Sequence, residues 1–144
     1  MRQMVRCTVV LFPAFVALVV AACSPLSPAT PLDSQQLNSI APAQLTNDPE
    51  LRGVVRAVSP IVARGLGFET VVTIDGKEWG DRNRGQQERI LQKIGAQMQA
   101  ALHSVQSGPP YNTFSARLIN DLGHLFGYVI VGGVNDTVTY SANR

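Results

Sequence analysis

His124 and Asp121 are the two side chains whose types and spacing most resemble a catalytic pair. On a helix, residues three apart lie on one side, so the carboxylate would orient the imidazole as a general base for hydrolysis. Arg117 would lie one turn further back. No G-x-S-x-G motif supplies a strained nucleophile, and a solvated polar helix face explains the same residues. A small hydrolase using His124 and Asp121 is therefore one hypothesis.

Metal and cofactor chemistry find less support in the sequence. Asp75, Glu78 and Asp81 are three residues apart around a tight turn, but positions three apart on a strand point to opposite faces. Turn and helix-cap roles account for Asp75 and Asp81 without a metal ion. His103 stands alone on its segment, and the spacings of zinc sites, phosphate loops and dinucleotide folds are absent. We predict no metal site and no cofactor.

Three aromatic residues, Trp79, Tyr111 and Tyr128, are candidates for a binding patch. Three aromatic residues can equally well belong to a hydrophobic core. The sequence alone leaves both interpretations open.

Charge argues against a nucleic-acid partner. The chain has 144 residues, which suits about one domain, and a formal net charge of +2. Two of its twelve basic residues, Arg2 and Arg6, belong to an N-terminal leader, so the rest has ten basic and ten acidic side chains. Nucleic-acid binders carry a basic face or stripe, and a neutral chain provides little basis for one.

The first 22 residues have the layout of a secretory signal peptide: two arginines, an apolar run of fourteen residues interrupted by Pro13, and small residues at 21 and 22. The run is too short for a membrane-spanning helix, which needs about 20 apolar residues. Val20-Ala21-Ala22-Cys23 resembles the lipobox of bacterial lipoproteins, with Val20 in place of the commoner Leu.

This resemblance implies that Cys23 receives a diacylglyceryl group, that the leader is cut before it, and that the new amine is acylated, for instance with palmitate. It also implies a cell-envelope location, anchored to a membrane. Ser24, in place of Asp, implies the periplasmic face of the outer membrane if the cell has two membranes. Two or more acyl chains make such anchoring stable.

Residues 23–49 follow as a stretch rich in Pro, Ser and Ala, with prolines at 25, 28, 31, 42 and 49. Such a composition buries too little apolar surface to offset its ordering entropy. We therefore predict a disordered tether that holds a globular domain, residues 50–144, on the order of 28 Å from the membrane.

That domain is predicted to be α+β, in the order helix, hairpin, helix, helix, hairpin. Residues 51–66 show an apolar stripe at helical spacing, and Pro60 leaves open whether they form one helix or two pieces. A hairpin over 68–79 turns at Asp75-Gly76, and a helix capped by Asp81 or Asn83 runs to about Gln106. A further helix spans 114–126.

The last predicted hairpin, 128–141, turns at Asn135-Asp136 or at Gly132-Gly133. The first choice pairs Val131 with Tyr140 and gathers the valines on one side, so we favour it. Two hairpins then make an antiparallel sheet of about four strands with helices packed on one face.

Three functional hypotheses follow. The leading one is a membrane-anchored, non-enzymatic interaction module for an envelope protein or surface polymer, serving envelope assembly or an exclusion or immunity role. The first alternative is a membrane-tethered hydrolase using His124 and Asp121. The second is a structural lipoprotein that self-associates through the heptad-like stripe of the long helix, although that stripe suits packing on its own sheet as well.

Overall fold

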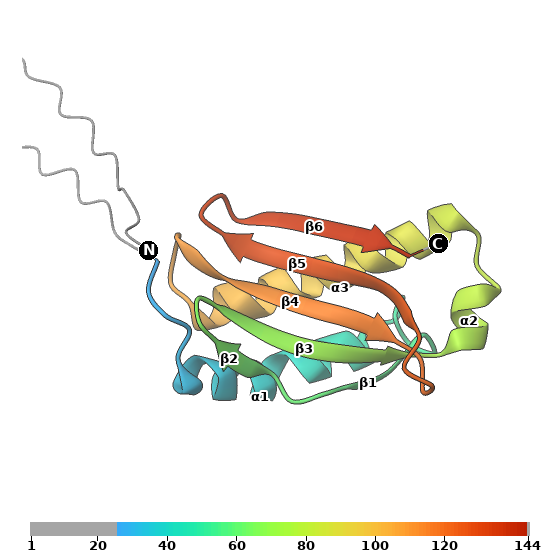
Figure 1. The fold of residues 1–144 in the computed structure, drawn as a ribbon, viewed down its shortest axis with the longest axis horizontal. Helices are drawn as coiled ribbons and strands as arrows, with labels where there is room; N and C mark the ends of the chain where they lie inside the picture. The colour runs from blue at the N-terminus through green and yellow to red at the C-terminus, as the bar shows by residue number, and fades with distance from the viewer. Residues whose placement is uncertain (1–25, 144) are drawn as a thin grey trace, which may run out of the picture.

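A computed structural model describes residues 26–143 (Figure 1). The elements run α1 (Pro31–Asn47), β1 (Val55–Val58), β2 (Val62–Arg64), β3 (Gly67–Ile74), α2 (Gly76–Gly80), α3 (Arg84–Val105), β4 (Tyr111–Ile119), β5 (Leu125–Gly133) and β6 (Thr137–Ala142). The predicted α+β class and the helices on one side of a sheet are confirmed: α1 and α3 lie behind the sheet in Figure 1.

The sheet itself differs from the prediction. It has six strands in the order β1-β3-β4-β5-β6, with β2 pairing to β3 beside β1. Strands β3 and β4 are parallel, and the other neighbours are antiparallel. Parallel neighbours need a long crossover, which α2 and α3 provide. The predicted four-stranded antiparallel sheet built from two hairpins is therefore wrong.

Helix α1 lies inside the predicted disordered tether, so that prediction is wrong for residues 31–47. Thr30 caps the helix by accepting the amide of Asp33 at 3.1 Å, and Pro31 occupies the first turn, where proline is favoured. Leu37, Ala41 and Leu45 form one narrow stripe that is fully buried in the core. The domain thus begins at α1 and not at residue 50.

Residues 51–66 form a turn and two short strands instead of the predicted helix. Pro60 lies between β1 and β2, and the Ser59 amide donates to the Val71 carbonyl at 2.8 Å, joining this segment to β3. The valines that suggested a helical stripe are β-branched and suit a pleated sheet equally well.

The predicted strand before Asp75 is confirmed as β3, but the hairpin after it is wrong. Asp75 caps α2: its Oδ1 accepts the amides of Lys77 and Glu78, each at 2.9 Å. The chain therefore enters a helix where a hairpin turn was expected, and Trp79 is buried in the core.

The long helix is confirmed as α3, with Asn83 as its cap. The Asn83 side chain accepts the Gln86 amide and the Gln86 side chain accepts the Asn83 amide, which is a capping box. Its apolar stripe is buried against the sheet: Leu91, Ile94, Met98, Ala101 and Leu102. This stripe is therefore not exposed for a second copy of the helix.

The predicted helix over 114–126 is wrong, because these residues lie in β4, a turn and β5. Burial alternates along β4: Phe114, Ala116 and Leu118 face the core, and Ser115 and Arg117 face away from it. The apolar residues also fitted helical spacing, which is why periodicity alone misassigned them.

The last hairpin is confirmed, with its turn at residues 134–136 and Asp136 at φ 48°. Its register differs from the prediction by two residues, since Val131 pairs with Val138 and Tyr140 pairs with Val129. A shift of two preserves the faces, so the valines still point to the core.

Candidate functional site

The structure does not assemble the predicted catalytic pair. Asp121 and His124 lie in the exposed turn between β4 and β5. The turn is held by Asn120, whose Oδ1 accepts the amides of Leu122 and His124 at 2.9 Å. Within the described chain, no hydrogen bond or ion pair joins the two side chains. The helix that would have aligned them does not form, so the helical geometry that suggested this pair is not present.

The three aromatic candidates lie in different places. Trp79 is buried against Phe126, with ring centroids 5.9 Å apart. Tyr111 stacks on His103 at 4.4 Å, and Tyr128 is exposed on the sheet face opposite the helices. The structure therefore does not bring them together as a patch.

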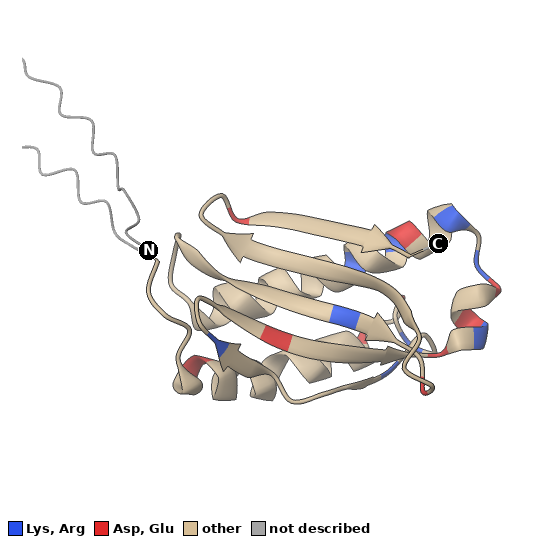
Figure 2. Ribbon diagram, in the orientation of Figure 1, with Lys and Arg blue, Asp and Glu red and all other residues tan. Residues whose placement is uncertain are grey.

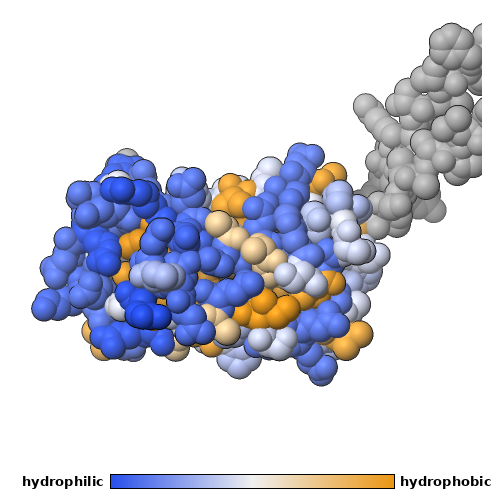
Figure 3. Space-filling model, turned by 180° about the vertical axis from the view of Figure 1, so that it is seen from behind, coloured by the Kyte–Doolittle hydropathy of each residue, from blue (hydrophilic) through white to orange (hydrophobic). Residues whose placement is uncertain are grey.

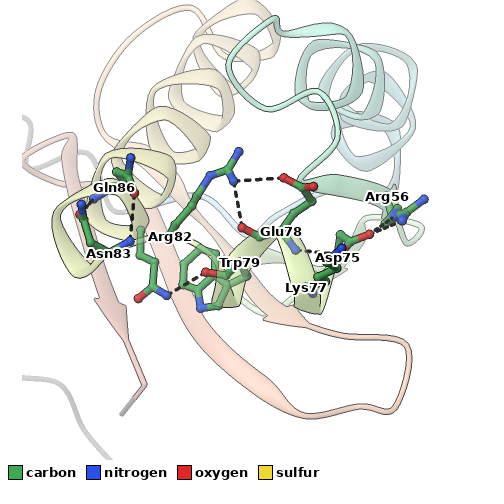
Figure 4. A network of polar contacts seen from close by, with 9 residues as sticks. Arg56, Asp75, Lys77, Glu78, Trp79, Arg82, Asn83 and Gln86 are labelled. Atoms are coloured by element: carbon green, nitrogen blue, oxygen red, sulfur yellow. Dashed lines mark hydrogen bonds and ion pairs between the residues drawn. The ribbon is translucent and has the colours of Figure 1, made fainter.

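The acidic residues around α2 have structural roles (Figure 4). Asp75 accepts the Glu78 amide and binds the Arg56 guanidinium, and these contacts hold the pKa of its carboxyl below the ordinary value. Glu78 pairs with Arg82 at 3.3 Å, and Asp81 is the C-cap of α2. Across residues 26–143, no group of three or more His, Cys, Asp or Glu side chains is placed to hold a metal ion.

A histidine–carboxylate pair that sequence reasoning missed joins α3 to the β5–β6 turn. His103 Nε2 lies 2.8 Å from Asp136 Oδ2, and Gln99 Nε2 donates to the same carboxylate at 3.0 Å. Burial alone would raise the pKa of Asp136, but the hydrogen bonds from His103 and Gln99 lower it overall. The hydroxyl of the neighbouring Ser104 donates to the Ala100 carbonyl and not to His103. The His103–Asp136 pair therefore connects a turn to a helix and engages no nucleophile from α3.

Asp48 is a buried carboxylate at the end of α1. Its oxygens accept the Glu50 amide at 2.9 Å and the Gln97 side chain at 2.6 Å, and Lys93 Nζ lies 3.4 Å away. Burial alone would raise its pKa, but these donors outweigh that effect, and the pKa lies below the ordinary value. Asp48 thus links α1, the loop after it and α3.

This lowered pKa has a consequence for stability. The carboxylate stabilises the fold above the unfolded pKa of about 3.9, and the contribution is lost as pH falls through the lower folded pKa. We expect Asp48→Asn to cost about 1.5–3 kcal/mol at pH 7, as for a lost charge-assisted hydrogen bond. Urea unfolding from pH 7 to pH 2 should show a shallower acid loss in the variant; equal slopes would contradict this role.

The sheet face opposite the helices remains uncovered and carries a hollow of about 520 Å³. Its lining comes from the β1–β2 connection and from β2, β3 and β4: Ser59, Pro60, Val62, Arg64, Glu69, Thr70, Val71, Ser115 and Arg117. Arg64 and Glu69 form an ion pair at 3.4 Å. Among the ion pairs of residues 26–143, none includes Arg117.

Apolar side chains flank this hollow. Arg117 lies between Val71 of β3 and Tyr128 of β5, and Ser115 lies opposite Ile130. Val62, Tyr128 and Ile130 are all large and exposed. The uncovered face therefore presents a guanidinium, hydroxyls and apolar groups together, and sequence reasoning missed it because β4 was assigned to a helix. We call it the open sheet face.

The fold and this face define an α+β domain with one covered and one open sheet surface. Comparison with protein-family models, curated proteins and solved structures finds no match. Cys23 and the leader lie outside the described residues. From residue 26 to residue 143, no helix has the length and apolar character to cross a bilayer.

Proposed function

We propose that this protein is a lipid-anchored component of the bacterial cell envelope whose domain binds a partner through the open sheet face. The hollow in that face is the observation that carries the binding role, because α1 and α3 pack on the opposite side and leave these residues uncovered. The lipobox-like Val20-Ala21-Ala22-Cys23 supports the anchor, with Cys23 as the lipidated residue.

The chemistry of the face favours an envelope protein or surface polymer that carries acidic groups beside apolar ones. Arg117 offers a guanidinium suited to bidentate hydrogen bonds with a carboxylate or phosphate. Tyr128, across the strand pair from it, adds an amphipathic aromatic surface of the kind enriched at protein interfaces. Binding at this face involves no covalent chemistry, so the proposal is a non-enzymatic interaction module.

Site-specific photo-crosslinking in intact cells tests this binding role. A crosslinking amino acid at Tyr128 should yield discrete adducts, whereas the same probe at Gln92, an exposed position on α3, should not. Adding Arg117→Glu should reduce the Tyr128 adducts about tenfold or more, since a charge-assisted hydrogen bond contributes about 1.5–3 kcal/mol. Arg89→Glu, an exposed arginine on α3, is the matched control and should have no effect.

Adducts that form equally at Tyr128 and Gln92, or that survive Arg117→Glu unchanged, would contradict binding through the open sheet face.

A further inference from the structure

The described chain is fixed to the domain almost from its first residue. Asn112 Nδ2 donates to the Ser27 carbonyl at 2.7 Å, and the Ala29 amide donates to the Gly65 carbonyl at 2.9 Å. The predicted tether is therefore packed against the domain from residue 27 onward.

Little chain remains between this point and the proposed lipid anchor. Ser27 is four residues after Cys23, and a fully extended chain spans at most about 14 Å over four residues. Acyl chains on Cys23 would lie in the hydrocarbon core, while the headgroup region adds only about 5–8 Å on each side. The end of the domain that holds Ser27 is therefore confined to the immediate neighbourhood of the headgroups.

That same end carries exposed apolar side chains from three separate elements. Leu32 in the first turn of α1 is 63% exposed, Leu66 in the β2–β3 turn is 51% exposed, and Val134 in the β5–β6 turn is 73% exposed. We call these three residues the apolar end. Figure 1 shows all three elements at the side of the molecule where the described chain begins.

Hydrogen bonds and strand pairing agree with that placement. The side-chain amide of Asn112 donates to the Leu66 carbonyl at 3.1 Å as well as to the Ser27 carbonyl, so Leu66 and Ser27 lie next to each other. Val134 follows Gly133, which pairs with Tyr111, the neighbour of Asn112. The face shown in Figure 3 agrees, because orange surface lies mainly toward the side where the described chain begins and blue surface predominates at the opposite end.

Charged side chains lie mainly at the end of the domain opposite the apolar end. Figure 2 shows that Lys, Arg, Asp and Glu are most concentrated around α2 and the start of α3, at the far end from Ser27. Near the apolar end, the Asp136 carboxylate is bound to His103 and Arg64 is paired with Glu69. Asp33 lies in the first turn of α1, where the helix dipole favours an acid. Contact with lipid at this end therefore desolvates few unpaired charges.

We propose that the apolar end rests on the lipid surface and sets the orientation of the domain. This inference depends on the proposed lipidation of Cys23 and adds a second membrane contact to it. The strands run from this end toward α2, as β3 does from Leu66 to the helix cap at Asp75. The strands would then point away from the membrane surface, and the open sheet face would stay accessible to a partner.

Fluorescence depth measurements on the full lipoprotein in vesicles test the orientation. The vesicles contain phosphatidylethanolamine and phosphatidylglycerol only, and a single cysteine introduced as Leu66→Cys or Val134→Cys carries an environment-sensitive dye. Cys7 leaves with the leader and the Cys23 sulfur carries the diacylglyceryl group, so the introduced thiol is the one available for labelling. Leu122→Cys is the control, since Leu122 is 79% exposed in the β4–β5 turn at the other end.

We expect the dyes at 66 and 134 to show blue-shifted emission and severalfold weaker iodide quenching than the dye at 122. Equal quenching at all three positions in vesicle-bound, acylated protein would overturn the orientation and leave the anchor intact. Protein that does not float with vesicles and keeps a free Cys23 thiol would overturn the anchor as well. Protection at 66 and 134 in cells but not in vesicles would show that a protein covers this end, which also contradicts the proposal.

Discussion

Replacing Leu37 with alanine is expected to lower the free energy of unfolding by about 2–5 kcal/mol, the usual cost of truncating a fully buried leucine. Leu37 has no exposed surface and belongs to the stripe by which α1 joins the core. Urea unfolding of the chain from residue 24 onward measures this loss.

Leu32→Ala is the matched control, because it makes the same substitution in the same helix at a position that is 63% exposed. It should change stability by no more than about 0.5 kcal/mol. If Leu37→Ala were as mild as Leu32→Ala, α1 would be a loosely attached tether and not part of the core. The short distance between domain and anchor would then have no basis.

Gly132→Ala is expected to cost about 2–5 kcal/mol. Gly132 has φ +85°, and an added Cβ would overlap the Asn112 carbonyl oxygen and approach Leu102 Cδ2 to 2.8 Å. Left-handed backbone strain accounts for about 1–2 kcal/mol and overpacking for about 1–3 kcal/mol. Thermal or urea unfolding measures the sum.

Gly133→Ala separates the two causes. Gly133 has nearly the same φ, +81°, but the nearest atom to its added Cβ is Thr113 Cγ2 at 3.9 Å. This variant should therefore lose only the strain contribution, about 1–2 kcal/mol. Equal losses at the two glycines would mean that β5 does not pack against β4 and α3 as closely as the structure shows.

The accuracy of sequence reasoning depended on how many local signals agreed. Helix α3 was predicted closely because the Asn83 cap, the apolar stripe and the Gly108-Pro109 stop all favour the same element. Strands β5 and β6 were found because β-branched residues alternate on either side of a turn at Asn135-Asp136.

Other elements had conflicting signals. Proline at 31 and 42 suggested disorder, yet Pro31 begins α1 and tertiary packing of Leu37 and Leu45 stabilises the rest. Asp75-Gly76 is as good a helix start as a hairpin turn, and only the parallel partner of β3 decides between them. Local patterns carry no information about that long-range pairing.

The candidate site was missed for the same reason. Arg117 appeared to belong to the polar side of a helix with Asp121 and His124, whereas it lies in the middle of β4 on the open sheet face. His103 and Asp136 are 33 positions apart along the chain, and their contact depends on how α3 crosses the β5–β6 turn. No local motif encodes either arrangement.

The anchor at Cys23 is the central claim, because both the envelope location and the membrane orientation rest on it. Mass spectrometry of the N-terminal peptide of the protein purified from its membrane fraction tests it directly. We predict a mature chain that begins at Cys23 and carries a diacylglyceryl group on its sulfur and an acyl group on its amine. A chain that retains residues 1–22, or one that contains Cys23 with an unmodified thiol, would contradict the account.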